Sequence, residues 1–252
     1  MTTATYRDDA NKIVILNPKG GCGKTTLATN LASYFALRGP PPTLIDTDPI
    51  GYTTRWLERR PPERAEINSI TLDELAPPGT QGWSFRKPRE AGAIIIDTPA
   101  ALNQREIAQL THDADCILIP VLPSAFDVQA TAQFIARLLL LTEFERPVAV
   151  VANRTRRNTR SLAMLLEVLK SFETPTIAVL RDSQNYVHAA DRGLGIYELP
   201  YHKVKHDIEA MEPIVSWLDQ LLVKTLQPGL LSRFNPLPRL LSSTAAELST
   251  AD

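Results

Sequence analysis

The chain has 252 residues, of which 44% are apolar, and a formal net charge of −1 at pH 7. This length and composition suit one α/β domain with extensions, and the near-neutral charge excludes a uniformly basic nucleic-acid binder. Two cysteines argue against a disulfide framework, and no apolar run approaches the ~18 residues that a membrane span needs. We therefore expect a cytoplasmic protein.

The first predicted element is a short buried strand over residues 12–17, which is apolar and rich in β-branched side chains. A glycine-rich loop follows it. Then Leu27, Leu31, Tyr34 and Phe35 recur at helical spacing, and Gly39 closes the predicted helix. A strand, a glycine-rich turn and a helix in this order point the N-terminus of the helix at an anion.

The loop itself has the closing half of a phosphate-binding motif. Its glycines let backbone N–H groups close around phosphate oxygens, Lys24 reaches the β- and γ-phosphates, and the Thr25 hydroxyl ligates magnesium. Lys19 is an additional lysine that comes too early to be the standard one. We interpret it as reaching a phosphate in a partner subunit, and the alternative is a solvated charge. The predicted nucleotide-binding residues of the loop are Gly20, Gly21, Cys22, Gly23, Lys24, Thr25 and Thr26.

Further apolar strands alternate with helical patterns along the chain. Their nearly continuous Ile, Val and Leu content indicates strands covered on both faces, and hence a mostly parallel sheet. The fold class we predict is a doubly wound α/β fold of the phosphate-loop NTPase type, with ligands at the carboxyl ends of the strands. The further strands are expected at 43–46, 93–97, 116–120, 147–152 and 176–180, and two of the helices at 126–141 and 162–172.

Aspartates end two of these strands. Asp97 follows an Ile-Ile-Ile run as in a Walker B strand, whose aspartate holds magnesium, and Asp46 ends the preceding predicted strand. Asp48 is the candidate that positions the attacking water. Thr25, Asp46 and Asp97 are therefore the predicted metal residues, whereas Lys19, Lys24 and Asp48 are the predicted catalytic ones. The alternative is that these aspartates are helix caps or turn formers.

The remaining sequence suggests where the domain begins and ends. We expect a flexible start over 1–10, a single ATPase domain over 11–226, and a disordered or partner-docking tail over 227–252. Residues 60–92 are rich in proline and glycine, and they predict an irregular excursion within the domain.

Taken together, the loop and the two aspartate motifs resemble those of the ParA/MinD ATPases, the deviant Walker A group. The resemblance spans roughly residues 11–225. It implies an ATP-sandwich dimer in which Lys19 crosses to the partner's phosphates, and slow Mg²⁺-dependent ATP hydrolysis that a partner protein stimulates. By the same resemblance, Asn153 would contact adenine. The family often has glutamine after the Asp-Pro dipeptide, where this chain has Ile50.

A turn with four arginines follows the strand predicted at 147–152. Arginines at the start of a helix are good phosphate partners, and we predict a non-specific contact with double-stranded DNA and a nucleoid-associated protein. The ParA branch places its basic residues similarly; an ordinary solvated turn is the alternative. The predicted DNA-binding residues are Arg154, Arg156, Arg157, Arg160, Arg181, Lys203 and Lys205.

Two other classes share the loop. A MinD-like membrane-surface ATPase would need an amphipathic tail, which Pro236 and Pro238 interrupt. A redox relative with a shared iron–sulfur cluster would need two exposed thiolates, which Cys22 and Cys116 do not suit.

The predicted function is therefore a ParA-like ATPase that positions an intracellular cargo through an activating adaptor of the ParB or McdB type. Residues 181–186 and 193–196 look most like the solitary ParA-like proteins with protein cargo, among which the carboxysome-positioning McdA group is one candidate. The residues do not name the cargo, because that specificity resides in the partner.

Overall fold

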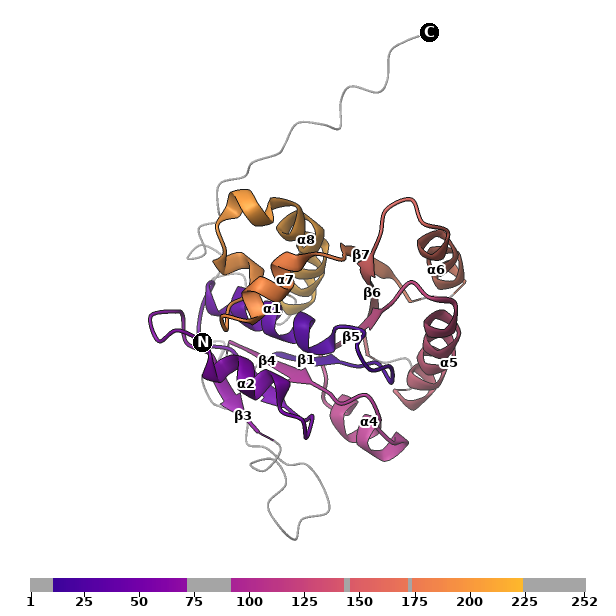
Figure 1. The fold of residues 1–252 in the computed structure, drawn as a ribbon. Coiled ribbons are helices and arrows are strands. Elements are labelled where there is room, and N and C mark those ends of the chain that lie inside the picture. Colours follow the sequence, from indigo (N-terminus) through magenta and orange to yellow (C-terminus); the bar gives the residue numbers. More distant parts are fainter. Residues whose placement is uncertain (1–10, 72–91, 143–145, 172–173, 224–252) are drawn as a thin grey trace, which may run out of the picture.

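The computed structural model describes residues 11–71, 92–142, 146–171 and 174–223 (Figure 1). The expectations for residues 1–10 and 227–252, and for most of the proline-rich stretch 60–92, concern residues outside these ranges. Among the residues that are described, no helix is both long and apolar enough to cross a membrane.

The centre of the fold is a seven-stranded parallel sheet with the strand order β3-β2-β4-β1-β5-β6-β7. The six predicted strands are confirmed, within three residues at each end. β3 was missed, because it has only three residues, lies at the sheet edge and is not fully buried. The strands are β1 (Asn11–Ile15), β2 (Thr43–Asp46), β3 (Asn68–Ile70), β4 (Ala93–Asp97), β5 (Cys116–Val121), β6 (Val148–Thr155) and β7 (Thr176–Arg181).

Helices connect the strands and cover the sheet. The two helices predicted at 126–141 and 162–172 are present as α5 and α6, and the first helix, α1, ends at Ala36, three residues before Gly39. The helices are α1 (Lys24–Ala36), α2 (Tyr52–Glu58), α4 (Gln104–Thr111), α5 (Ala125–Leu141), α6 (Arg160–Lys170), α7 (Gln184–Ala190) and α8 (Tyr201–Val223), with a short 3-10 helix η1 (Ile196–Glu198).

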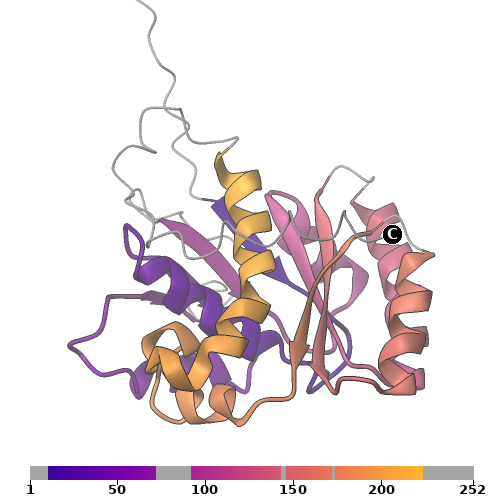
Figure 2. The ribbon, with the colours of Figure 1, turned by 90° about the horizontal axis from the view of Figure 1, so that it is seen from above.

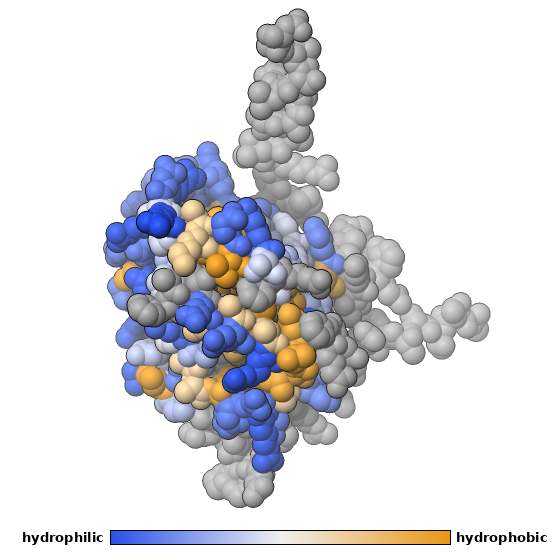
Figure 3. Space-filling model, turned by 90° about the vertical axis from the view of Figure 1, so that its right-hand side faces the viewer, coloured by the Kyte–Doolittle hydropathy of each residue, from blue (hydrophilic) through white to orange (hydrophobic). Residues whose placement is uncertain are grey.

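The helices form a layer on each face of the sheet, as the apolar strands require. Ile95 faces the layer of α1, α2 and α8, whereas Ile94 and Ile96 face that of α4, α5 and α6. In Figure 2 the long α8 lies across its face of the sheet. The α5 and α6 side, turned to the viewer in Figure 3, has apolar surface among polar side chains, and Leu140 and Met164 are exposed on these helices.

The sheet topology brings the predicted site together at one edge. β1 lies between β4 and β5, and the loop after β1 leads into α1 at the carboxyl ends of the strands. Asp46 and Asp97 are direct neighbours in the β2–β4 pairing. Ligands of open α/β sheets bind at such an edge, where connections leave a central strand in opposite directions.

Candidate nucleotide-binding site

The loop between β1 and α1 is already closed by its own hydrogen bonds. The Asn17 amide donates to the Pro120 carbonyl at 2.7 Å, and its oxygen accepts from the Lys19 N–H at 2.8 Å. Lys24, whose side chain is buried, folds back over the loop and donates to the carbonyls of Asn17 (3.1 Å) and Lys19 (3.2 Å). This places the Lys24 ammonium above the loop, with Lys19 exposed beside it.

Gly23 caps the start of α1 in the left-handed region, with φ +99°. A β-carbon here would lie 2.1 Å from Nδ2 of Asn153, so the position admits only glycine. The same Asn153 amide donates to the Cys22 carbonyl at 2.8 Å, and its oxygen accepts from the Arg154 N–H. Asn153 thus supports the phosphate loop in this structure, and its contact with adenine stays a prediction.

Asp97, at the end of β4, is buried beneath the loop. One carboxylate oxygen, Oδ2, accepts from the hydroxyls of Thr25 (2.7 Å) and Thr53 (2.6 Å). The other, Oδ1, is buried and has no hydrogen-bond partner among the described residues. Burial raises the pKa of Asp97 to about 6, although the hydrogen bonds from Thr53 and Thr25 act to lower it. A carboxylate oxygen left open beside a threonine hydroxyl is the kind of oxygen ligand set that suits Mg²⁺.

Asp46 is held by the first turn of α2, and Asp48 by the turn that precedes it. Asp46 accepts from the N–H and hydroxyl of Thr54 through one oxygen (2.9 and 3.0 Å) and from the Asp48 N–H through the other (3.1 Å). The Asp48 side chain, which is only half-buried, accepts from the Ile50 N–H at 3.0 Å. Each carboxylate thus has the capping or turn contact that the alternative interpretation assigned to it, and the proposed roles of Asp46 at the metal and of Asp48 at the attacking water stay predictions.

The sequence analysis did not identify the two threonines of α2 that contact Asp97 and Asp46. Thr53 and Thr54 lie on α2, seven and eight residues after Asp46. The available signal was a pair of hydroxyl side chains soon after the Asp-Pro turn. Periodicity gave no indication of α2 as a helix, because the segment is short and mostly polar.

The predicted basic residues fall into two groups. Arg156, Arg157 and Arg160 are exposed, and none forms an ion pair with a residue that the structure describes. Of the other four, three form ion pairs within the chain and one is exposed on α8. Arg154 pairs with Asp182 (3.3 Å), Arg181 binds Asp207 through two N–H groups (2.6 and 2.9 Å), Lys205 pairs with Glu209 (3.8 Å), and Lys203 is exposed at the start of α8.

Comparison with known protein families shows which family this chain belongs to. The model of the CobQ/CobB/MinD/ParA nucleotide binding domain matches residues 13–196, which include the loop, the three aspartates and Asn153. The chain belongs to this family. This match confirms the predicted family resemblance, and the seven-stranded parallel sheet with its flanking helices confirms the predicted fold class.

Individual relatives of this CobQ/CobB/MinD/ParA protein include the maintenance of carboxysome distribution protein A of Halothiobacillus neapolitanus. It is 28% identical over 191 residues, which cover 74% of this chain and 87% of the relative. Among solved structures, apo McdA of Cyanothece covers 81% of this chain and 98% of its own, with 18% identity and a TM-score of 0.62. MinD with Mg-ADP from Pyrococcus horikoshii covers 87% and 100%, with 16% identity and a TM-score of 0.60. The structural likenesses concern the fold.

Proposed function

We propose that this protein is a Mg²⁺-dependent ATPase that dimerises on ATP, binds double-stranded DNA non-specifically and positions an intracellular cargo. The observation that carries the proposal is the closed phosphate loop, in which Lys24 lies over backbone carbonyls and Thr25 contacts Asp97 at 2.7 Å. The Lys24 ammonium now donates to two neutral carbonyls, whereas a γ-phosphate would offer it an anionic acceptor and add Coulomb attraction to the hydrogen bond. A γ-phosphate should therefore draw Lys24 away from the carbonyls of Asn17 and Lys19.

Each residue of the site has a distinct proposed role in hydrolysis. The loop amides from Gly20 to Thr26 would hold the phosphates, while Thr25 and Asp97, supported by Asp46, would hold the cation. Bound Mg²⁺ would neutralise charge on the phosphates. Asp48, which is partly exposed at the loop before α2, would orient the attacking water.

ATP hydrolysis by the purified protein tests this part directly. Lys24→Ala should abolish both ATP binding and turnover, and Asp48→Ala should abolish turnover while ATP still binds. Equal turnover in wild type and Lys24→Ala would reject the assignment of this loop as the nucleotide site.

The dimerisation proposal depends on Lys19. Its backbone is held in the loop by Asn17 and Lys24, but its side chain is exposed beside the phosphate position, where it could reach a second subunit. A cation brought in by a partner supplies charge only in the assembled complex, as an arginine finger does. Lys19→Ala should then lose ATP-dependent dimerisation in sedimentation velocity and retain ATP binding as a monomer. Dimers of normal stability in that variant would overturn the proposal that Lys19 reaches the phosphates bound by the partner subunit.

The DNA proposal is supported by the exposed arginines Arg156, Arg157 and Arg160, which lie at the same edge of the sheet as the phosphate loop. Arg154, Arg181, Lys203 and Lys205 were predicted with them, and three of these four form ion pairs within the chain. Contacts with phosphates alone should make affinity fall by about 0.9 log units per phosphate for each log unit of salt.

Charge reversal tests the arginine patch. Arg157→Glu with Arg160→Glu should abolish retention on DNA and leave ATP-dependent dimerisation intact. The matched control, Lys170→Glu with Arg192→Glu, makes the same charge change at other exposed positions and should reduce retention little. Equal loss in both double variants would show that net charge, not this patch, governs DNA binding.

The cargo proposal is supported by the relatives. The Halothiobacillus relative is named for maintenance of carboxysome distribution, and a relative in Rhizobium radiobacter is named ParA. A MinC:MinD complex from Aquifex aeolicus shows that a protein of this fold can work with a partner. We infer a cytoplasmic, nucleoid-associated protein whose hydrolysis an adaptor stimulates. Capture with the ATP-locked Asp48→Ala variant should recover an adaptor that accelerates wild-type turnover, and no acceleration by any captured protein would reject this part.

A further inference from the structure

The short helix α2 contacts both strand-end carboxylates through consecutive residues. Thr53 donates to Asp97 at 2.6 Å, and Thr54 donates to Asp46 from its N–H and its hydroxyl. Thr53 and Asp97 are both essentially inaccessible to solvent, at 0% and 1% exposure. A contact between two buried groups cannot be replaced by water without a rearrangement of the packing.

The hydrogen bond from Thr53 has a specific consequence for the orientation of Asp97. Thr25 and Thr53 approach the same oxygen, Oδ2, from the phosphate loop and from α2. Two donors on one oxygen fix the plane of the carboxylate and leave Oδ1 without a partner among the described residues. A buried acceptor in that condition is costly unless a ligand satisfies it.

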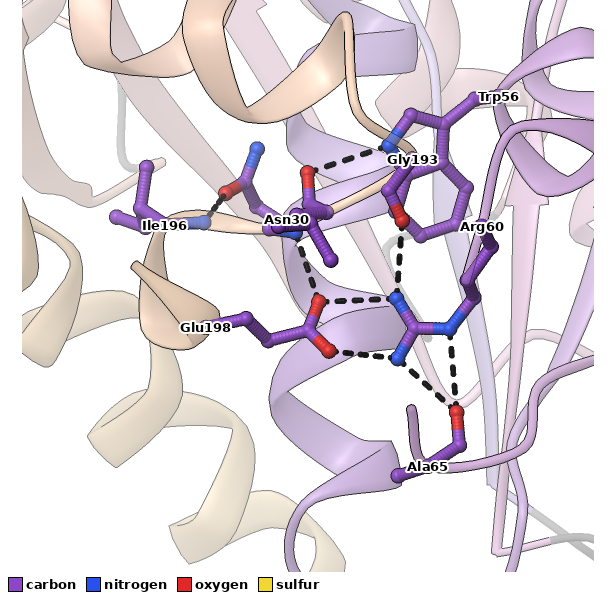
Figure 4. Close-up of polar contacts among 9 residues, drawn as sticks. Asn30, Trp56, Arg60, Ala65, Gly193, Ile196 and Glu198 are labelled. Atoms are coloured by element: carbon purple, nitrogen blue, oxygen red, sulfur yellow. Dashed lines mark hydrogen bonds and ion pairs between the residues drawn. The ribbon is translucent and has the colours of Figure 1, made fainter. Parts of the chain in front are cut away.

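The other end of α2 is anchored through Trp56 and, just beyond the helix, Arg60 (Figure 4). Trp56 donates from its ring N–H to the Leu194 carbonyl at 3.2 Å. Just after the helix, the Arg60 guanidinium forms a two-bond ion pair with Glu198 (2.8 and 2.9 Å) and also donates to the carbonyls of Gly193 and Ala65. The Arg60 and Glu198 side chains are 7% and 0% exposed. A seven-residue helix held at both ends is a rigid support.

We propose that Thr53 is a positioning residue, which fixes Asp97 so that its open oxygen faces the divalent cation of the bound nucleotide. The inference rests on the proposed nucleotide-binding function and adds a residue from α2 to the metal centre. Thr53 does not touch the cation in this arrangement; it acts through Asp97, with α2 and its anchor at Arg60 and Glu198 as the support. Groups that orient metal-ligating side chains commonly affect metal affinity about 10–100-fold.

The test compares nucleotide affinity with and without the cation. The affinity of a fluorescent ADP analogue is measured by anisotropy in Mg²⁺ and in EDTA, and the ratio of the two gives the contribution of the cation. Thr53→Val, which keeps the shape and removes the hydroxyl, should lower this ratio by about 10-fold. Affinity in EDTA should stay unchanged, because the loop still binds the phosphates. Alkaline buffer keeps Asp97 ionised in every variant.

Controls separate positioning from stability. Thr53→Ser retains the hydroxyl and should restore the wild-type ratio. Thr111→Val removes another buried hydroxyl, which donates to the Ile107 carbonyl at 2.8 Å on the opposite face of the sheet, and should leave the ratio unchanged. Thr53→Ala removes the same hydroxyl with less side-chain volume and replaces the valine variant if that one does not fold.

The outcomes distinguish the two proposals. If wild type binds the ADP analogue equally in Mg²⁺ and in EDTA, the proposed Mg²⁺-nucleotide function fails, and this inference fails with it. If wild type shows the cation effect and the hydroxyl-free variant, Thr53→Val or its replacement Thr53→Ala, keeps it in full, only the positioning role of Thr53 is overturned. A lower melting temperature with an unchanged ratio would likewise assign Thr53 a purely structural role and reject the inference.

Discussion

Breaking the buried ion pair between Arg60 and Glu198 should destabilise the fold strongly, because it leaves one buried charge without its partner. Glu198→Gln is the sharpest perturbation, because it keeps the volume of the side chain and removes its charge. In the native protein the Glu198 carboxylate accepts two bonds from Arg60 and one from the Gly195 N–H at 2.9 Å. In the variant, the Arg60 charge stays buried with only neutral acceptors around it.

The magnitude follows from the burial of both partners. Removal of one member of a buried pair typically costs about 3–5 kcal/mol, because the remaining charge is uncompensated. The glutamine oxygen still accepts one bond from Arg60, while its NH₂ group faces the other Arg60 donor, so we expect about 3 kcal/mol, at the low end of that range. At about 2–4 °C per kcal/mol for a chain of this size, the melting temperature should fall by about 6–12 °C.

Thermal and urea unfolding followed by circular dichroism would measure this effect. Glu167→Gln is the matched control, since Glu167 pairs with Lys170 at 2.7 Å but both side chains are more than 70% exposed. That exposed pair should contribute less than about 0.5 kcal/mol. If Glu198→Gln lost no more stability than Glu167→Gln, the reasoning that burial makes the Arg60 pair costly to break would be wrong.

Two further predictions concern the phosphate loop and acid stability. Gly23→Ala should abolish nucleotide binding in the same anisotropy assay, because its β-carbon would meet Asn153 and its φ of +99° disfavours any other residue; binding of wild-type strength would contradict it. Burial alone would raise the pKa of Asp207, but hydrogen bonds from Arg181 and its neighbours outweigh burial and lower that pKa. The ionised Asp207 side chain therefore stabilises the fold fully at pH values above its unfolded pKa of ~4. This stabilisation is lost as the pH falls through the folded pKa, which is lower. The stability difference between wild type and Asp207→Asn should shrink in urea titrations at progressively lower pH, and a constant difference would refute this.

The strands and the loop could be predicted because their signals are local. The apolar run ending at Asp97 is short and rich in isoleucine, which favours a strand covered on both faces, and a glycine-rich turn between a strand and a helix has few other uses. α2 and β3 escaped prediction because they have seven and three residues and no clear apolar period. Elements of this kind are stabilised by what they pack against rather than by their own sequence.

By itself, the sequence determined the phosphate loop, the strand-end aspartates and the doubly wound class, since each follows from residues close together in the chain. Only the tertiary structure decided which groups hydrogen-bond to those aspartates and which basic residues form ion pairs within the chain. Thr53 meets Asp97 across 44 positions, Arg60 meets Glu198 across 138, and Arg181 meets Asp207 across 26. Such contacts depend on the packing of α2, η1 and α8 around the sheet, and the spacing of neighbouring residues in the sequence does not predict them.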